Sequence, residues 1–307
     1  MSDAMKPRMP PTPEKLVYQI QKLLNVETID LDLYRGMAIP GGTGRVFGGQ
    51  VIGQALIAAC NTVDDSRQPH SLHAFFLRAG DNTKPIIYRV VRDYDGGSFT
   101  NRRVIATQNG QPILNMAASF QVAEDGMEHS TLMPDVPPPE ELKTEQEHLL
   151  ANKDKLPEML VRHMSRPRPI EMRPVHSRSG LFGIKRDPVN QMWVRLVAPL
   201  DGASQAMQRS ILAHLSDMGL LSTCAFPHGV DWFTPSFQSA SLDHTIWFHE
   251  DVKADEWMLY SMDSSWGGHA RGLNRGMIFS RDGRLIASTA QEGLMRMRKG
   301  KGLVPTR

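Results

Sequence analysis

The pattern of apolar and polar positions along the chain occurs twice. One copy covers residues 73–121 and the other covers residues 244–293. In each copy a histidine and an aromatic cluster precede a polar turn, an apolar strand, an arginine-rich strand, a hairpin turn and a last apolar strand. Repeats that stack into solenoids have periods of roughly 20–50 residues. The much longer separation of these copies predicts a duplicated domain whose halves pack on each other, with a functional site at the seam.

Helical periodicity marks three further segments. An amphipathic helix is predicted from Pro13, with Thr12 as its N-cap, because one face gathers Leu16, Val17, Ile20, Leu23 and Leu24. A strand is expected at 32–39. Residues 49–60 are apolar almost all round, which predicts an enclosed helix. Its counterpart in the second half is a helix over 204–221, with Met207, Ile211, Leu215 and Met218 on the buried stripe.

Each half therefore has one central helix ahead of three or four antiparallel strands. Strands are expected at 86–91 and 257–262, and two more, at 169–175 and 191–197, open the second half. The helix precedes the strands instead of alternating with them, which argues against a doubly wound parallel sheet. A proline-rich, charged stretch from Glu124 to about Met164 reads as a linker that crosses the surface and includes a solvated helix.

Composition narrows the class of protein. A chain of 307 residues suits two domains, and its 35 basic and 33 acidic side chains leave a net charge of +2, which gives no argument for nucleic acid. Two cysteines, Cys60 and Cys224, make neither a disulfide framework nor a metal-binding spacing. No segment predicts a signal peptide or a membrane span. A cytoplasmic protein without a metal site is expected.

The common enzyme motifs are absent. The chain contains no GxSxG nucleophile elbow, no Walker loop, no GxGxxG after a strand and no HExxH. Chemistry must therefore be sought in isolated polar residues of apolar segments. Asp217 is the first of these, since it lies at the margin of the apolar stripe of the second central helix. Such an acid either pairs with an arginine at the helix end or has a functional role.

Four more residues are candidates on similar grounds. Ser241 begins the second copy, and strand alternation would place it with Asp243 on one face and His244 on the other, which disfavours a Ser–His pair in that strand. His244 matches His73 in the first copy, which suggests a structural role. Gln291, in a strand of small residues, needs hydrogen-bond partners if it is buried. Gly48 and Gly49 either simply start a helix or bring backbone N–H groups close to a ligand.

Long segments of the chain resemble the acyl-CoA thioesterase II family, which includes bacterial thioesterase B and its peroxisomal relatives. The matching segments in the first half are GRVFGGQVIGQAL, SLHAFFLRAGD, IIYRVVRDYDGGSFTNRRV and QNGQPILNMAASFQ. Those in the second half include LSDMGLLSTCAFPHG, SLDHTIWFH and DGRLIASTAQEGLMR. They occur in one order at compatible spacings over roughly residues 15–297.

The resemblance implies an α+β double hotdog, in which a curved antiparallel sheet wraps a central helix in each half and the two sheets join edge to edge. We expect an N-terminal hotdog at 13–125, a linker at 126–167 and a C-terminal hotdog at 168–298. The second hotdog would carry the catalytic residues. Hotdog sheets favour self-association, so a homodimer or homotetramer is expected.

The resemblance also implies the reaction, which is hydrolysis of acyl-CoA to a free acid and CoA without a cofactor. Asp217, Ser241 and Gln291 match the family's water-holding residues, with Ser241 where bacterial thioesterase B has threonine. Asp217 would accept a proton from water, while the other two side chains orient that water. Gly48 and Gly49 would contribute to an oxyanion site. Arg271 is a candidate for substrate binding on its charge alone.

Two rival functions stay open. A hydratase or dehydratase on the same fold would use an Asp–His pair on a hydroxyacyl-CoA, and His214, one helical turn before Asp217, supplies a candidate histidine. A non-catalytic acyl-CoA binding module would bind the same ligand without releasing thiol. Incubation with a saturated acyl-CoA distinguishes these functions, because only hydrolysis releases free thiol from it.

Overall fold

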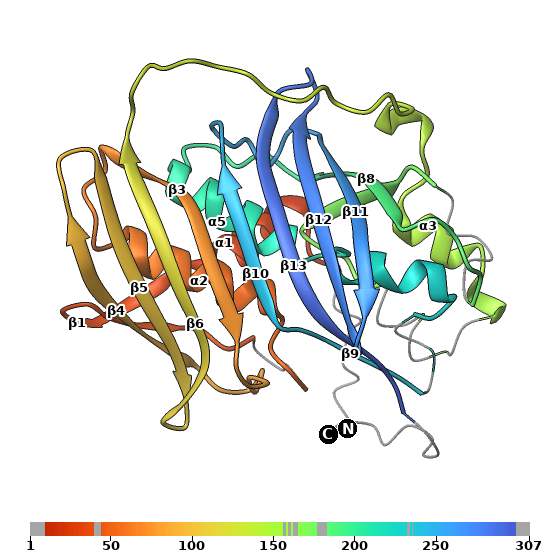
Figure 1. Ribbon diagram of the computed structural model, residues 1–307, viewed down its shortest axis with the longest axis horizontal. Helices are drawn as coiled ribbons and strands as arrows, with labels where there is room; N and C mark the ends of the chain where they lie inside the picture. Colours follow the sequence, from red (N-terminus) through yellow and green to blue (C-terminus); the bar gives the residue numbers. More distant parts are fainter. Residues whose placement is uncertain are drawn as a thin grey trace, which may run out of the picture.

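In the computed structural model, one large antiparallel sheet lies against a layer of helices (Figure 1). The structure describes residues 10–298 except 40–43, 156–157, 159–160, 162–164, 177–182, 232–233 and 235. Within these residues the strands form a single sheet of 13 strands. The strands of the two halves meet in its middle, where β3 (Arg67–Phe76) pairs with β10 (Asp243–Phe248). The expected α+β double hotdog, with two edge-joined sheets, is therefore observed.

The two halves use the same order of elements, a central helix followed by a meander of strands. The first half also contains α1 (Pro13–Leu24), β1 (Val26–Asp30), β2 (Leu33–Gly36), α2 (Gly48–Cys60), β4 (Ile86–Asp95), β5 (Phe99–Gln108) and β6 (Gln111–Val122). The second half also contains β7 (Ile170–Pro174), β8 (Val189–Leu196), α5 (Gln205–Ser216), the 3-10 helix η3 (Leu221–His228), β9 (Phe237–Ser241), β11 (Met258–Gly268), β12 (Arg271–Ser280) and β13 (Leu285–Met297).

The three predicted helices begin within one residue of their predicted starts, and one of them ends earlier than predicted. Thr12 caps α1 by accepting a hydrogen bond from the Lys15 N–H, as predicted. Helix α5 ends at Ser216, short of the predicted residue 221, and Asp217 is its C-cap residue. Gly219, with φ of 79°, takes the left-handed conformation that follows many helix ends. The shorter helix turns the chain after Asp217 back toward the sheet.

The strand predicted at 32–39 is present as the shorter β2, and it forms half of a tight hairpin with β1, which was not predicted. Strands β1 and β2 pair with each other across a turn in which Asp32 has a φ of 56°. A carboxylate side chain next to a turn tolerates this left-handed conformation better than most side chains. The Asp32 carboxylate also accepts hydrogen bonds from Arg92 of β4, which ties the hairpin to the next strand.

Helices α2 and α5 pack directly against each other in the core, which is a second contact between the two halves besides the pairing of β3 with β10. Glycines of α2 make the approach possible, since a Cβ at Gly53 would lie 3.1 Å from the carbonyl oxygen of Ser210. The Ser210 hydroxyl donates to the carbonyl of Gly53 at 2.9 Å. The two helix axes can therefore lie close together, and each helix end is placed near residues of the other half.

The segment between the halves packs on the outer face of the second half, where it includes η1 (Pro139–Glu141), α3 (Glu145–Leu150) and η2 (Lys153–Lys155). It crosses the upper edge in Figure 1 and then covers a second apolar cluster built on Trp193, Trp257 and Phe279. The Trp193 indole N–H donates to the carbonyl of Pro137 at 2.9 Å. The linker therefore belongs physically to the second half, while the exact domain boundaries remain predictions.

Candidate active site

A cavity of about 370 Å³ opens where the ends of α2, α5 and β9 meet. Asp217 and Ser241 of the second half lie on its wall beside Gly48 of the first half. Its remaining lining residues are mostly apolar, namely Val46, Phe47, Met218, Gly219, Leu221 and Ser222. Apolar walls with a few convergent polar groups are typical of small-molecule sites. The cavity therefore lies at the seam that the duplication predicts.

Asp217 is held by two hydrogen bonds from elements far away in the sequence. The Gly49 N–H at the start of α2 donates to its Oδ2 at 2.8 Å, and Gln291 Nε2 donates to its Oδ1 at 2.6 Å. Unpaired N–H groups and the helix dipole make a helix N-terminus favourable for an anion. Burial nevertheless raises the pKa of Asp217 to about 6, against the lowering effect of both donors.

The alternative that Asp217 meets an arginine at its helix end is wrong. Among the described residues, its hydrogen bonds come from Gly49 and Gln291. A carboxylate with a pKa near 6 is still ionised at neutral pH, yet it is a much stronger base than an ordinary aspartate. The site therefore provides a carboxylate suited to removing a proton from water.

Gln291 lies on β13 with its side chain fully buried behind Asp217. Its Nε2 reaches His244 Nδ1 at 3.2 Å as well as Asp217 Oδ1. Its Oε1 is buried and has no hydrogen-bond partner in the part of the chain that the structure describes. A buried carbonyl oxygen without a partner is costly unless water or a ligand supplies a hydrogen. Gln291 therefore combines a fixed donor with a buried acceptor that has no partner among the described residues.

Ser241 reaches the cavity because the strand that carries it ends there. Strand β9 stops at Ser241, opposite Gly293 of β13, and β10 begins only at Asp243. The break at Leu242 means that Ser241 and His244 do not belong to one continuous strand, as the alternation argument assumed. In the described residues no hydrogen bond joins these two side chains, and the half-buried Ser241 hydroxyl faces the same cavity as Asp217.

His244 belongs to the candidate site, but the comparison of the two sequence copies matched it with the wrong residue of the first half. His244 is fully buried on β10, whereas His73 is exposed on the other face of β3 and pairs with Thr245. The match of the two histidines is therefore wrong by one position, and a shift of one residue in a strand reverses the face. The equivalent of His244 in the first half is Leu72. Both side chains are buried, and each lies five residues before a backbone N–H, of His249 or Leu77, that donates to the equivalent carbonyl, of Ile286 or Ile113.

The place of His244 on the apolar face of a strand is the signal that could have identified it. An imidazole on the same face of β10 as the buried Ile246 and Phe248 needs partners for both nitrogens. His244 finds them in Ser216 and Gln291, at 2.8 Å and 3.2 Å. Burial lowers its pKa to about 4, so the ring is neutral at neutral pH. Its Nδ1 lies 4.0 Å from Asp217 Oδ1.

The three tentative binding residues are placed differently from one another. Gly48 lines the cavity, but the Gly49 N–H is used by Asp217 and so holds the carboxylate instead of facing a ligand. Arg271 is not among the residues that line the cavity. Its guanidinium pairs with Glu292 at 2.8 Å and lies near the Trp266 ring. Its role in substrate binding stays a prediction.

His214 does not form the acid–base pair that a dehydratase would need. Its ring packs edge-on against Phe47, it is buried, and its pKa is lowered to about 4 by that burial. The histidine next to Asp217 is instead His244, and both of its ring nitrogens are engaged by other side chains. Neither histidine is among the described residues that line the cavity, so neither of these two rings faces a substrate there.

The first half has different side chains at the equivalent positions. At the end of α2 the C-cap residue is Asn61 in place of an aspartate, and the positions that match His244 and Gln291 are Leu72 and Ala118, which pair across β3 and β6. Opposite Ala118 stands the buried Arg102, where the second half has Asn274 opposite Gln291. Among these equivalent positions, the candidate side chains are therefore present in the second half and absent from the first.

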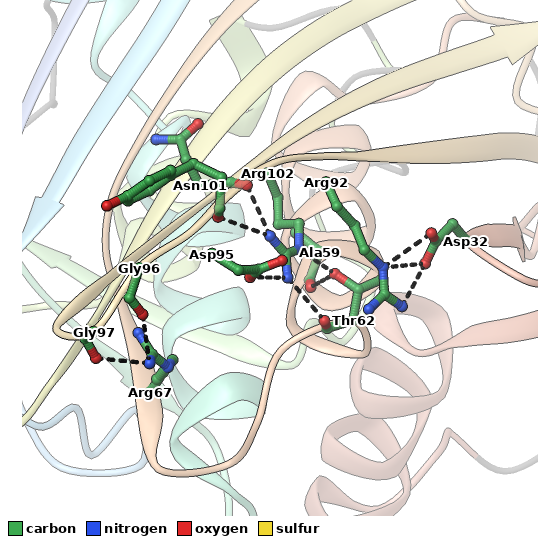
Figure 2. A network of polar contacts seen from close by, with 11 residues as sticks. Asp32, Ala59, Thr62, Arg67, Arg92, Asp95, Gly96, Gly97, Asn101 and Arg102 are labelled. Carbon is green, nitrogen blue, oxygen red and sulfur yellow. Dashed lines mark hydrogen bonds and ion pairs between the residues drawn. The ribbon is translucent and has the colours of Figure 1, made fainter.

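Figure 2 shows what fills that end of the first half. The Arg102 guanidinium donates to Thr62 Oγ1 and to the Thr62 carbonyl just beyond α2, and it pairs with Asp95 at 2.6 Å. A cation at a helix C-terminus complements the partial negative charge there. Arg102 is only 2% exposed, so these bonds also satisfy a charge that would otherwise be costly to bury. This network serves the fold.

Gly49→Ala is expected to destabilise the protein and to lower kcat. A Cβ at Gly49 would lie against the backbone carbonyl of His214, which cannot move without displacing α5. Overpacking of this kind costs about 1–3 kcal/mol, and it would separate the Gly49 N–H from Asp217. Thermal unfolding and steady-state turnover measure the two effects. Gly97→Ala is the control, because a Cβ there meets nothing within 4 Å.

No helix in the described part of the chain has the length and apolar character needed to cross a membrane. The described residues also contain no group of three or more histidine, cysteine, aspartate or glutamate side chains that could hold a metal ion.

Comparison with known proteins places the chain in a family. Residues 39–121 match the profile described as the acyl-CoA thioesterase N-terminal domain, and residues 134–295 match that of the C-terminal domain. The chain is 39% identical to acyl-coenzyme A thioesterase 8 of Homo sapiens, over 91% of this chain and 89% of that protein. It is 38% identical to acyl-CoA thioesterase 2 of Haemophilus influenzae, over 89% of this chain and 96% of that protein.

Solved structures agree with this assignment. Acyl-CoA thioesterase II TesB2 from Mycobacterium marinum has a TM-score of 0.75 and 37% identity, covering 92% of this chain and 100% of its own. A tesB protein of Mycobacterium avium subspecies paratuberculosis has a TM-score of 0.73 and 26% identity, covering 91% of this chain and 99% of its own. The chain belongs to the acyl-CoA thioesterase family.

Proposed function

We propose that this protein hydrolyses acyl-CoA to a free carboxylic acid and CoA, with a water molecule activated by Asp217. The observation that carries the proposal is a cavity on the seam that Asp217 and Ser241 line, with the buried Gln291 bonded to Asp217 from behind. Membership of the acyl-CoA thioesterase family supports the choice of substrate. The chemistry needs no cofactor, because a buried carboxylate and oriented water suffice for a thioester.

The proposed reaction begins when the ionised Asp217 accepts a proton from water while the oxygen of that water bonds to the thioester carbonyl carbon. The carbonyl oxygen becomes an oxyanion. Its collapse re-forms the C=O bond, breaks the C–S bond and releases CoA as a thiolate. A thiol pKa near 8.5 makes the thiolate a good leaving group, so no strong general acid is required. The proton held by Asp217 then returns to solvent or to the thiolate.

Ser241 and Gln291 orient the water in this proposal. Neither side chain is a base at neutral pH, but the Gln291 Oε1 lacks a partner among the described residues and can accept a hydrogen from the water. The Ser241 hydroxyl can donate to the water oxygen or accept from it. Water fixed in this way attacks from a defined direction, which lowers the entropic part of the barrier.

The oxyanion is proposed to be stabilised by the Gly48 N–H at the start of α2, since the Gly49 N–H already binds Asp217. A Cβ at Gly48 would come within 2.7 Å of Asp217 Oδ2, so only glycine leaves room between the carboxylate and the helix start. Arg271, which projects from β12 near Glu292, is retained as a proposed contact for the anionic part of CoA.

The activity is expected to fall with decreasing pH below about 6. Asp217 must be ionised to act as a base, and burial raises its pKa to about 6, so kcat/KM should decrease about tenfold per pH unit on the acid side. Initial rates between pH 4.5 and 8.5 measure this. Circular dichroism at each pH confirms that the protein stays folded. An acid limb centred near pH 4 would mean that the base is an ordinary exposed carboxylate.

The experiment that tests the function is thiol release from saturated acyl-CoA substrates of several chain lengths. Hydrolysis predicts one thiol per acyl-CoA consumed. A hydratase or dehydratase would release no thiol from a saturated substrate, and a binding module would saturate with the ligand without consuming it. Absence of thiol release across the whole panel would refute the proposed function.

Assembly and location remain proposals. The outer face of the central strands exposes Phe75 and Trp247, at 58% and 38%, which supports the proposal of a homodimer or homotetramer. Light scattering of the purified protein measures its mass directly. The cytoplasmic location inferred from the sequence also remains a prediction.

A further inference from the structure

A chain of hydrogen bonds runs behind the proposed catalytic carboxylate. It starts at the Ser216 hydroxyl, which donates to the Ala213 carbonyl at 2.9 Å. It continues from Ser216 Oγ to His244 Nε2 at 2.8 Å, and from His244 Nδ1 to Gln291 Nε2 at 3.2 Å. It ends where Gln291 Nε2 meets Asp217 Oδ1 at 2.6 Å. The side chains of Ser216, His244 and Gln291 are all fully buried.

The donor and the acceptor of each hydrogen bond follow from the number of hydrogens that each group carries. A serine hydroxyl has one hydrogen, and Ser216 gives it to Ala213, so its oxygen can only accept from His244 Nε2–H. A neutral imidazole with its hydrogen on Nε2 has an unprotonated Nδ1, which must accept. Neutrality agrees with the lowered pKa of His244. Gln291 Nε2 therefore donates one hydrogen to His244 and the other to Asp217.

This arrangement excludes the reversed amide. If the Gln291 side chain turned over, its Oε1 would face the Asp217 carboxylate and the unprotonated His244 Nδ1, which are both acceptors. We propose that His244 is a positioning residue, whose ring, oriented by Ser216, holds the Gln291 amide with its NH2 group on Asp217 and leaves its unpartnered Oε1 as the acceptor proposed for the attacking water. The inference rests on the proposed function, because it assigns a role within that reaction.

His244 acts through Gln291 and does not touch the substrate. It is fully buried, does not line the cavity, and uses both ring nitrogens within the protein. The first half is consistent with this role, since Leu72 and Ala118 stand at the two equivalent positions. The half that lacks the amide also lacks the imidazole that would orient it.

The test compares His244→Leu, which reproduces the residue of the first half, with His244→Asn, whose amide oxygen can accept a hydrogen bond near the position of Nδ1. We expect His244→Leu to lower kcat at least about tenfold with KM changed less than about twofold, because a misoriented amide impairs the attack and not binding. His244→Asn should recover most of this loss. His73→Leu, on the outer face, is the control and should leave both constants unchanged.

A second experiment shows whether His244 affects kcat through the Gln291 amide. In a Gln291→Ala background, His244→Leu should lower kcat less than about twofold further, since the group that it orients is gone. An undiminished loss in that background, or equal losses for His244→Leu and His244→Asn, would overturn the proposal. Thermal unfolding of each variant accompanies the kinetics.

If His244→Leu does not fold, Ser216→Ala carries the same test with the ring in place. It removes the acceptor that selects the tautomer, so kcat should fall at least about threefold with KM unchanged, and the loss should again vanish in the Gln291→Ala background. An unchanged kcat would overturn the proposal. The failure of the proposed function would look different, because the unsubstituted protein would then release no thiol at all.

Discussion

Asp217→Asn is expected to lower kcat at least about 100-fold while the protein stays folded. General-base catalysis contributes roughly 10²–10⁴ to enzymatic rates, and an amide cannot accept the proton. The substitution keeps the shape of the side chain and retains one oxygen that can accept from the Gly49 N–H. The expected loss therefore reports the missing base and not a collapsed cavity.

The measurement is steady-state thiol release at pH 8, where the unsubstituted Asp217 is ionised. Asp93→Asn is the matched control, since Asp93 is an exposed carboxylate of the first half that pairs with Arg103 at 3.2 Å. It undergoes the same chemical change far from the cavity and should keep full activity. Turnover by Asp217→Asn within a few-fold of the unsubstituted protein would show that another group is the base.

Most of the fold could be predicted because its pattern is local. A few neighbouring residues determine the apolar face of α1 and the Thr12 cap. The same is true of the hairpin turns at Asn109–Gly110 and before Gly283. The β1–β2 hairpin was missed because its turn has no Gly–Asn signal and depends on one residue, Asp32, with positive φ. The joining of the sheets at β3 and β10 came from the family resemblance alone.

The candidate site was predictable only in part, because its hydrogen bonds are not local. Asp217 and Gly49 are 168 residues apart, and Asp217 and Gln291 are 74 apart, so no spacing in the sequence announces either contact. The resemblance supplied the three side chains that meet there. It did not supply His244, because aligning two similar strands by their histidines placed one of them on the wrong face.

Gln291→Ala is expected to lower kcat about 10- to 100-fold. A hydrogen bond to a charged group contributes about 1.5–3 kcal/mol, and the substitution removes the bond to Asp217 together with the acceptor proposed for the water. Since the Gln291 bond lowers the pKa of Asp217, its loss should also move the acid limb of the pH profile to higher pH. Initial rates across the pH range measure both effects.

Two further variants separate hydrogen bonding from packing. Gln291→Met keeps most of the volume of the buried side chain but neither donates to Asp217 nor offers a carbonyl, so it should lose nearly as much activity as Gln291→Ala. Gln111→Ala, an exposed glutamine at the start of β6, is the control and should be neutral. Full activity in Gln291→Met would assign Gln291 a packing role only.

Combined substitutions test whether the three side chains hold one water molecule. Once Asp217 has become asparagine, the water has no base, so adding Gln291→Ala or Ser241→Ala should lower kcat only about threefold further. Ser241→Ala alone should cost less than Gln291→Ala, because Ser241 contacts the water and not the carboxylate in this mechanism. Independent groups would instead show losses that multiply in the triple variant. That outcome would leave Asp217 as a base but would remove the shared water from the mechanism.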